Sequence, residues 1–436
     1  MRLVLLIILS LFFSNSFSNE QTAPYSFKLK NGMKVVVIEN KRAPVIAQMV
    51  WYNFGSGIEE KGKSGLAHFM EHLMFKGTRK FPDNYYSNYV SKIGGSENAF
   101  TSYDYTAYYQ VFPKSELKKI MKMEADRMTN LTLTEENVEI EKRVILEERF
   151  QRIESDPSSK LDESMRSILF PNHYYGRPII GWRHEIEGLT YDDVLSFYKK
   201  NYKPNNAVLV LSGDVDLEKA KKLSKKYFGK IRKGKKEPKL KVMDPDLNTN
   251  IFVTMKHSTV KQPVWKKFYR TISYKSDIDD SIALDMGLKI VASGTSSLLY
   301  QKLVEEKKTF SVVGGYYQGL TKGEGNVYLY AISNDKKKSE EIDRIIMKEF
   351  KNIINEKLTP KRFEIEKKKY FFDTIYKKDG VLNPAQIYGE ALTVGLTMDE
   401  IKKWREKVNN ISLDDVKKTL DQLYENQNYV IGELSN

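Results

Sequence analysis

The chain carries the segment LTYDDV at Leu189–Val194 and repeats it 222 residues later as ISLDDV at Ile411–Val416. In each copy a Thr or Ser is followed three residues later by Asp, a pattern that resembles a capping box and predicts a helix start. Each predicted helix leads into an apolar run, Ala207–Leu211 in the first copy and Tyr429–Ile431 in the second. The repeat therefore predicts two α+β domains related by duplication.

A change in composition separates the two copies. Residues 232–250 are charged, contain two prolines and lack periodic apolar positions, so they read as a linker. The length of 436 residues agrees with two to three domains at roughly 150 residues each. We expect an N-terminal domain at 19–231, a linker at 232–250 and a C-terminal domain of the same fold at 251–436.

The first 18 residues have the pattern of a secretory signal peptide. Arg2 precedes an apolar run over Leu3–Phe13, and small residues occupy the −3 and −1 positions of a cleavage site after Ser18. The run is shorter than the roughly 20 residues that span a bilayer. We expect an exported protein, periplasmic or secreted, with no stable membrane span after cleavage. An uncleaved anchor is the alternative.

Composition excludes several kinds of chemistry. Cysteine is absent, so disulfides, thiolate catalysis and iron–sulfur clusters are excluded, and only five histidines are available. Lys and Arg number 71 against 57 Asp and Glu, a net charge of +14. The basic residues are mostly interleaved with other types and no nucleic-acid-binding motif accompanies them, which favours solvated faces over nucleic-acid binding.

Hydrophobic patterns predict the elements of the first domain. Tyr25–Glu39 reads as a hairpin with Asn31-Gly32 at its turn, and Val45–Phe54 as a strand. Gly65–Lys76 has apolar residues at helical spacing, and Asn98–Phe112 alternates like a single strand. A long helix begins at Thr134.

The predicted helix at 65–76 contains the pattern H-x-x-E-H. His68 and His72 are four residues apart, so both imidazoles project from one helix face and can bind one metal ion. Glu71 lies beside them, where it can hold a metal-bound water. The alternative, two histidines in an ordinary core helix, leaves two buried imidazoles to be satisfied.

Two histidines do not complete a catalytic zinc site, which needs a third protein ligand. The helix from Thr134 supplies Glu141, Glu147 and Glu148, of which Glu141 and Glu148 share one partly apolar face. Carboxylates on such a face are paired or metal-bound, because a lone buried charge is costly. Surface glutamates on an acidic helix are the alternative.

The sequence resembles the pitrilysin/insulinase family of zinc metallopeptidases, in its half-length subfamily that includes mitochondrial processing peptidase. The resemblance runs over nearly the whole chain after the leader. The segments that carry it are GLAHFMEH at 65–72, FKGT at 75–78, NAFTS at 98–102, EKRVILEE at 141–148 and HYYG at 173–176. The family implies two α/β sandwich domains that form half of a four-domain clam-shell chamber.

The resemblance also assigns roles to residues. It implies one Zn²⁺ per chain held by His68, His72 and Glu148, with Glu141 behind the ligands, where it orients His72. Zinc would activate water, with Glu71 as general base, for hydrolysis of peptides or unfolded protein segments. A triad of two histidines and a carboxylate also suits iron in oxygenases, but that chemistry leaves Glu71 without a role.

The family's substrate-binding strand corresponds to Asn98, Ala99, Phe100 and Thr101. The free edge of such a strand pairs with the backbone of an extended peptide. An ordinary core strand is the alternative at any single position.

One departure from the family pattern concerns the partner. Active members supply an Arg and a Tyr from a C-terminal domain, and this chain has Val304 and Ser311 at those positions. We therefore expect a heterodimer in which a second half-length subunit supplies the Arg/Tyr pair. A local substitute such as Tyr316 or Tyr317 is one alternative. A non-catalytic scaffold subunit of the same fold is the other.

Overall fold

The computed structural model describes residues 23–235, 242–335, 337–377 and 379–436. The predicted leader at 1–18 lies outside these residues. The first domain contains β1 (Tyr25–Lys28), β2 (Lys34–Glu39), β3 (Val45–Tyr52), η1 (Ser56–Ile58), α2 (Leu66–Leu73), α3 (Tyr85–Lys92), β4 (Ser96–Thr101), β5 (Thr106–Pro113), η2 (Lys114–Glu116), α4 (Leu117–Asn130), α5 (Glu135–Arg149), η3 (Phe150–Glu154), α6 (Pro157–Leu169), η4 (Tyr174–Gly176), α7 (Arg183–Gly188), α8 (Tyr191–Asn201), η5 (Pro204–Asn206), β6 (Ala207–Gly213) and α9 (Leu217–Tyr227).

The second domain repeats the plan. It contains β7 (Ile251–Lys256), β8 (Val264–Thr271), α10 (Ile278–Val291), α11 (Leu298–Tyr300), η6 (Gln301–Glu306), β9 (Phe310–Gln318), β10 (Gly325–Ser333), α12 (Ser339–Asn352), η7 (Ile353–Lys357), α13 (Pro360–Tyr376), α14 (Leu382–Val394), α15 (Met398–Lys402), α16 (Trp404–Asn410), α17 (Leu413–Glu425) and β11 (Tyr429–Ser435). The described residues at 232–235 and 242–250 belong to no helix or strand.

The two sheets share the order of five strands, and the first sheet has β1 as an additional edge strand. In the described residues the first sheet has the order β1-β2-β6-β3-β5-β4 and the second the order β7-β11-β8-β10-β9. In each sheet the strand after the repeated segment, β6 or β11, pairs parallel on one side and antiparallel on the other. The helices α8 and α17 both begin with complete capping boxes, at Thr190 and Ser412. The prediction of two duplicated α+β domains is confirmed.

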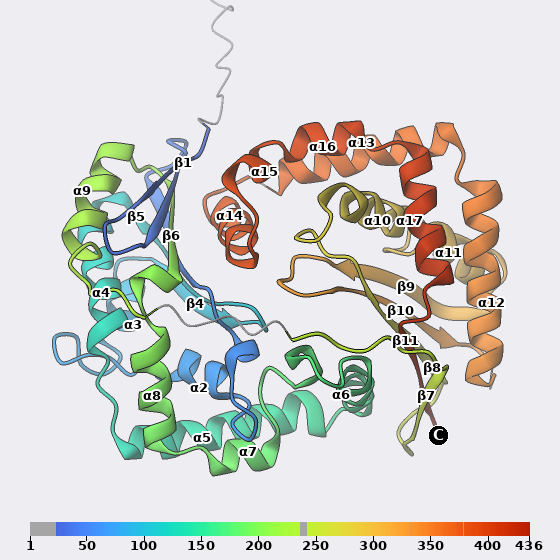
Figure 1. Ribbon diagram of the computed structural model, residues 1–436, viewed down its shortest axis with the longest axis horizontal. Helices are drawn as coiled ribbons and strands as arrows, with labels where there is room; N and C mark the ends of the chain where they lie inside the picture. The colour runs from blue at the N-terminus through green and yellow to red at the C-terminus, as the bar shows by residue number, and fades with distance from the viewer. Residues whose placement is uncertain (1–22, 236–241, 336, 378) are drawn as a thin grey trace, which may run out of the picture.

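Each sheet is covered on one face by a helix from the other domain. Figure 1 shows α14 and α6 between the two sheets, α14 against β3 and β6 and α6 against β7, β8 and β11. Both helices lie close to their sheets. A Cβ atom added to Gly389 of α14 would be 2.0 Å from Trp51 Nε1, and one added to Gly432 of β11 would be 2.2 Å from Met165 Sδ of α6. The domains therefore share their hydrophobic cores.

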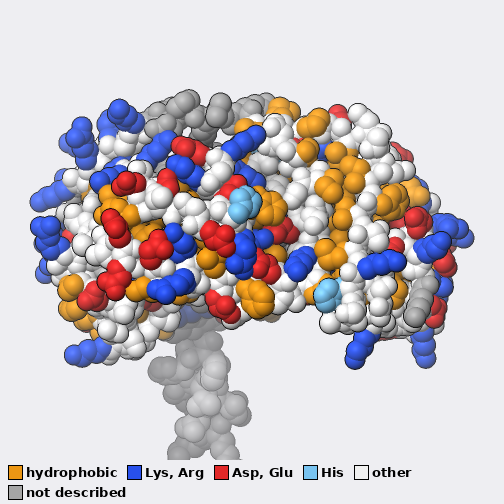
Figure 2. Space-filling view, turned by 90° about the horizontal axis from the view of Figure 1, so that it is seen from below, with side chains coloured by type: hydrophobic (Ala, Val, Ile, Leu, Met, Phe, Trp, Pro, Cys, Tyr) orange, Lys and Arg blue, Asp and Glu red, His pale blue; other side chains and the backbone are white. Residues whose placement is uncertain are grey.

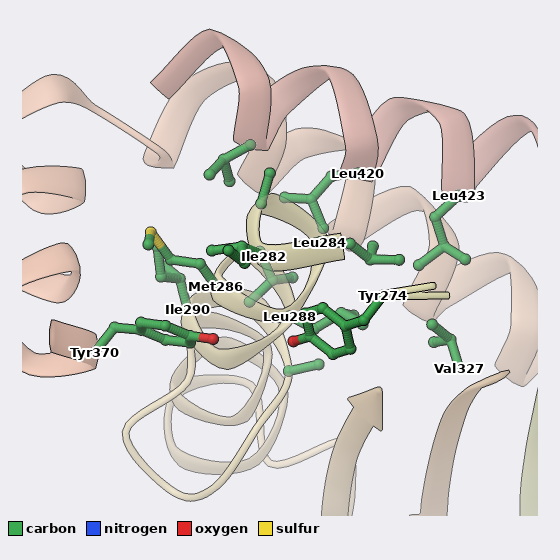
Figure 3. Packing of buried hydrophobic residues seen from close by; sticks show 14 of the residues in the cluster. Tyr274, Ile282, Leu284, Met286, Leu288, Ile290, Val327, Tyr370, Leu420 and Leu423 are labelled. Atoms are coloured by element: carbon green, nitrogen blue, oxygen red, sulfur yellow. The ribbon is translucent and has the colours of Figure 1, made fainter. Parts of the chain in front are cut away.

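The outer face of each sheet carries helices of its own domain. Figure 3 shows this layer in the second domain, where Leu284 and Leu288 of α10 lie near Leu420 of α17. A Cβ atom added to Gly287 would be 2.9 Å from Leu420 Cγ, so a side chain there would meet α17. In the first domain the matching layer contains α2, whose Phe69 is fully buried.

Most of the elements predicted in the first domain are confirmed, with one exception. The hairpin at 25–39 turns at Gly32, which has φ of +96°. Asn98–Phe112 is not one strand. It forms two antiparallel strands, β4 and β5, joined by a turn at Ser102–Tyr105, where the Ser102 amide donates to the Tyr105 carbonyl at 2.8 Å. Ser102, Tyr103, Asp104 and Tyr105 continue the alternation of polar and aromatic residues through this turn, so the pattern does not mark the chain reversal.

Candidate metal centre

The helix that carries the two histidines is fixed at its N-terminus. Gly65 precedes α2 with φ of +89°, and a Cβ atom there would be 2.4 Å from the Ile180 carbonyl oxygen. The buried Glu59 side chain accepts hydrogen bonds from the amides of Gly65, at 3.0 Å, and Ala67, at 2.7 Å. Burial raises the pKa of Glu59 to about 8. These contacts hold α2 against the first domain, so that its histidines have one orientation.

Three potential ligands converge at one point. Glu148 Oε2, from α5, lies 3.4 Å from His72 Nε2 and 3.7 Å from His68 Nε2. The three ligand atoms all lie within 4.8 Å of one another, and the described residues contain no other such group of three His, Cys, Asp or Glu. Two nitrogens and one carboxylate oxygen form the donor set of many catalytic zinc sites, which keep a fourth position for water. The residues present therefore fit a zinc ion.

Hydrogen bonds orient His72 toward this point. Glu141 Oε1 lies 2.9 Å from His72 Nδ1, which leaves Nε2 to face Glu148. Glu141 Oε2 in turn pairs with Lys76 Nζ at 2.5 Å. Carboxylates that hold metal-binding imidazoles in this way fix the ring and its tautomer. Nδ1 of His68 is buried and has no hydrogen-bond partner among the described residues.

Burial and charge separate the protonation states of the two histidines. Burial, with the charge of His72, lowers the pKa of His68 to about 4. Burial also lowers the pKa of His72, but hydrogen bonds to Glu141 and Glu148 outweigh it and raise the pKa to about 9. The hydrogen bond with His72 Nδ1 lowers the pKa of Glu141 to about 2, and a separate interaction with His72 Nε2 lowers the pKa of Glu148. Both carboxylates are therefore ionised at neutral pH.

Glu71 faces the same site from α2. Its Oε2 accepts a hydrogen bond from Thr101 Oγ1 at 2.5 Å. Burial raises the pKa of Glu71, and the bond from Thr101 opposes that shift. A carboxyl group with a raised pKa beside a metal site is suited to take up and return a proton near neutral pH.

The structure adds two basic side chains that the motif did not predict. Arg152 Nη1 lies 2.9 Å from Glu148 Oε1, and Lys76 holds Glu141. Each lies four residues after a site residue in the sequence, Arg152 in η3 after Glu148 of α5, and Lys76 just beyond the end of α2 after His72. This spacing was the available signal.

The predicted substrate strand is β4, at the edge of the first sheet. β5 is its neighbour, and its outer side has no strand partner in the described residues. The Phe100 ring packs edge-on against Trp51, with centroids 5.3 Å apart. Asn98 Oδ1 accepts a hydrogen bond from the Ala99 amide. The side chains of Phe100 and Thr101 are thus engaged within the chain, and the backbone of β4 remains at the edge.

The residues at the positions of the family's Arg and Tyr lie in the second domain. Val304 belongs to η6 and packs against the core, and Ser311 is exposed on β9. Of the two candidate substitutes, Tyr317 donates to the Ile272 carbonyl at 2.8 Å, within its own domain. Tyr316 is 45% exposed and stacks on Tyr328.

The face of the molecule seen from below carries both signs of charge. Figure 2, seen from below, shows Lys and Arg side chains interleaved with Asp and Glu over the left part of the molecule. In the described residues no helix is both long and apolar enough to span a bilayer.

Comparison with known proteins identifies the family of the chain. The model of "Insulinase (Peptidase family M16)" matches residues 34–182, and that of "Peptidase M16 inactive domain" matches residues 188–370. The zinc protease PqqE of Helicobacter pylori is 32% identical over 330 residues, which cover 74% of this chain and 72% of that protein. The chain therefore belongs to the insulinase family of peptidases, M16.

More distant relatives share parts of the chain or its fold. A probable β subunit of the mitochondrial-processing peptidase of Schizosaccharomyces pombe is 31% identical over 203 residues, 47% of this chain and 44% of that one. A crystal structure of a Helicobacter pylori protease, 25% identical, superposes with a TM-score of 0.89 over 95% of this chain and 99% of that one. The periplasmic protease PqqL of Escherichia coli, 19% identical, shares the fold with a TM-score of 0.77, over 95% of this chain and 48% of that one.

Proposed function

We propose that the protein is a zinc-dependent endopeptidase that cleaves peptides or unfolded protein segments. The observation that carries this proposal is the convergence of His68 Nε2, His72 Nε2 and Glu148 Oε2 within 4.8 Å, with Glu71 beside them. His68, His72 and Glu148 would hold one zinc ion per chain, and Glu141 would orient His72. A bound zinc ion would lower the pKa of water toward about 7 and polarise the scissile carbonyl.

The chain's own residues supply the proton transfers and the substrate alignment. Glu71 accepts the proton of the attacking water and then donates it to the leaving amine. The exposed edge of β4, at Asn98–Thr101, pairs with the backbone of an extended peptide. Recognition through main-chain hydrogen bonds makes few demands on sequence, which suits unfolded segments as substrates.

Replacing Glu71 tests the proposal directly. Glu71→Gln should retain zinc and lower turnover by at least about 100-fold, because only the proton carrier is lost. Metal content is measured on the purified protein, and cleavage is measured with a library of unstructured peptides. One zinc per chain without any cleavage in all conditions, or no zinc at all, would favour the scaffold function instead.

We also propose that the active enzyme contains a second half-length subunit of the same fold. This chain has neither Arg at 304 nor Tyr at 311, and the hydroxyl of Tyr317 is used within the second domain. The match to 48% of the PqqL chain, and to a protein named as a β subunit, supports a two-part enzyme. The partner would carry the Arg and Tyr.

Reconstitution tests the partner. The chain alone should cleave peptides weakly, and mixing with the partner should restore cleavage. A single well-placed donor to an oxyanion accounts for about 10²–10³ in rate, so Arg→Ala in the partner should remove most of the gain. Full activity of the purified chain alone would contradict the heterodimer and point to Tyr316.

We propose an exported location, periplasmic or secreted. The predicted leader at 1–18 supports it, and the related PqqL structure is described as a periplasmic protease. Cell fractionation with an antibody, together with N-terminal sequencing of the exported form, tests both the location and cleavage after Ser18.

A further inference from the structure

The side chain of Thr101 does not face the edge of the substrate strand. Thr101 is the last residue of β4, and its hydroxyl donates to Glu71 Oε2 at 2.5 Å. The neighbouring Phe100 projects to the opposite face of the sheet, where it packs on Trp51. Alternate residues of a strand point to opposite faces, so Thr101 and Ala99 share the face toward α2. Ala99 is buried there, in the same core cluster as the apolar residues of α2.

A second threonine supports this hydroxyl. Thr106 is the first residue of β5 and is the direct cross-strand partner of Thr101. Their hydroxyl oxygens are 3.5 Å apart, and Thr106 is fully buried. The Thr101 hydroxyl donates its one hydrogen to Glu71, so any bond between the threonines would have Thr106 as donor. The β4–β5 ladder holds both residues in register.

Glu71 has no other hydrogen-bond partner in the described contacts, while burial raises the cost of its charge. A glutamate has three rotatable side-chain bonds, so a single strong bond has a large effect on where its carboxylate lies. We infer that Thr101 is a positioning residue, which holds the Glu71 carboxylate in the orientation for proton transfer rather than binding the substrate through its side chain. This inference rests on the proposed peptidase function.

Strand β4 connects substrate binding to the general base. The backbone of β4 is the proposed docking edge for the peptide, and the side chain of the last β4 residue holds Glu71. One rigid strand therefore aligns the peptide and the carboxylate with respect to each other. Rigid placement of reacting groups is a large part of catalytic rate, and a displacement of about 1 Å can cost 10²-fold.

A pair of substitutions at 101 tests the role. Thr101→Val keeps the shape and removes the hydroxyl, and it should lower kcat by about 10-fold or more with little change in KM. Thr101→Ser restores a hydroxyl and should recover most of kcat. Thr254→Val, an exposed threonine on β7 in the other domain, is the matched control and should leave kcat unchanged. Zinc content and melting temperature are measured for each variant.

A double-mutant cycle separates positioning from substrate binding. In the Glu71→Gln background, Thr101→Val should cause little further loss of turnover, because the group that Thr101 positions is already inactive. Peptide affinity, measured by fluorescence anisotropy in that same background, should not change. A large rise in KM or in the peptide Kd would overturn the inference and make Thr101 a substrate-binding residue. Equal loss of kcat in both backgrounds, or failure of Thr101→Ser to recover activity, would also overturn it.

These outcomes are distinct from failure of the proposed function. If the unsubstituted chain, alone or with its partner, binds no zinc and cleaves no peptide, the peptidase proposal fails. If the unsubstituted enzyme is active and Thr101→Val is equally active, only the positioning role fails.

Discussion

Zinc and a proton compete for the same nitrogen of His72. In the metal-free protein Glu141 and Glu148 stabilise the imidazolium, and its pKa is raised to about 9. His68, with a pKa lowered to about 4, is already neutral above that pH. Glu148 is ionised because its pKa is lowered. Between about pH 5 and 9, His72 is therefore the ligand that must lose a proton before zinc binds.

This competition predicts the pH dependence of zinc binding. As the pH is raised toward 9, the apparent zinc affinity should rise by about tenfold per pH unit, because only deprotonated His72 binds zinc. Above about pH 9 it should level off, because His72 is then already deprotonated. Calorimetry at pH 7 in two buffers of different ionisation enthalpy should show release of about one proton per zinc. An affinity that is constant from pH 6 to 8 would contradict the assignment of His72 as a protonated ligand.

Single substitutions test whether Glu148 is the carboxylate that binds zinc. His72→Ala and Glu148→Gln each delete a proposed ligand and should lower zinc affinity the most. Glu141→Gln should lower it by about 10–100-fold, as loss of a group that orients a ligand does. Glu147→Gln is the matched control, because Glu147 is exposed on α5 and contacts Gln151.

Competition titrations with a zinc chelator rank these four variants. The assignment of Glu148 would be wrong if Glu148→Gln kept full zinc affinity while Glu141→Gln or Glu147→Gln lost it. The carboxylate ligand would then be at another position of α5.

At the scale of elements, the start of α2 requires a glycine at position 65, immediately before the helix. Gly65 has φ of +89°, and a Cβ atom would clash with the Ile180 carbonyl. Gly65→Ala should therefore destabilise the fold by about 1–3 kcal/mol more than Gly62→Ala. Gly62 is the matched control, because its φ is +88° but no atom lies within 4 Å of its added Cβ.

Thermal or urea unfolding measures this difference, and zinc affinity is measured on the same variants. Because α2 carries both histidines, Gly65→Ala should also weaken zinc binding, whereas Gly62→Ala should not. Equal stability of the two variants would contradict the close contact at Ile180.

Local patterns predicted most elements but failed at one turn. The hairpin at 25–39 and the capped helices follow from turn and cap residues that act within a few positions. The single strand expected at Asn98–Phe112 is wrong, because a Ser-Tyr-Asp-Tyr turn continues the aromatic alternation without Gly or Pro. The chain reverses there through backbone and Ser102 side-chain hydrogen bonds that composition does not reveal.

At the scale of the whole molecule, the exchanged helices α14 and α6 join the two domains. Gly389 lies against Trp51, so Gly389→Ala places a methyl group where the indole lies. Overpacking of this kind costs about 1–3 kcal/mol and should lower the melting temperature. Gly188→Ala is the matched control, because no atom lies within 4 Å of its added Cβ.

Calorimetry also tests whether the domains unfold together. Because each sheet is covered by a helix from the other domain, the unsubstituted protein should unfold in one cooperative transition. Two separate transitions would contradict a shared core. A melting temperature that does not change in Gly389→Ala would contradict the close packing of α14 on β3.

The sequence by itself determined that the chain contains two duplicated domains and that His68 and His72 project from one face of a helix. The repeated capping boxes at Thr190 and Ser412 and the four-residue spacing of His68 and His72 are local, so helix geometry alone fixes their consequences. The spacing on α5 singled out Glu141 and Glu148, which share one helix face, and only the resemblance to a family assigned Glu148 as the ligand and Glu141 as the residue that orients His72.

The tertiary structure alone decided which groups meet. The approach of α5 to α2 places Glu148 at the two Nε2 atoms and Glu141 at Nδ1, and the packing of β4 brings Thr101 to Glu71. The exchange of α14 and α6 is likewise absent from any local pattern. These contacts join segments that are tens to hundreds of residues apart. They depend on how whole faces pack, whereas helix spacing and caps depend only on neighbouring residues.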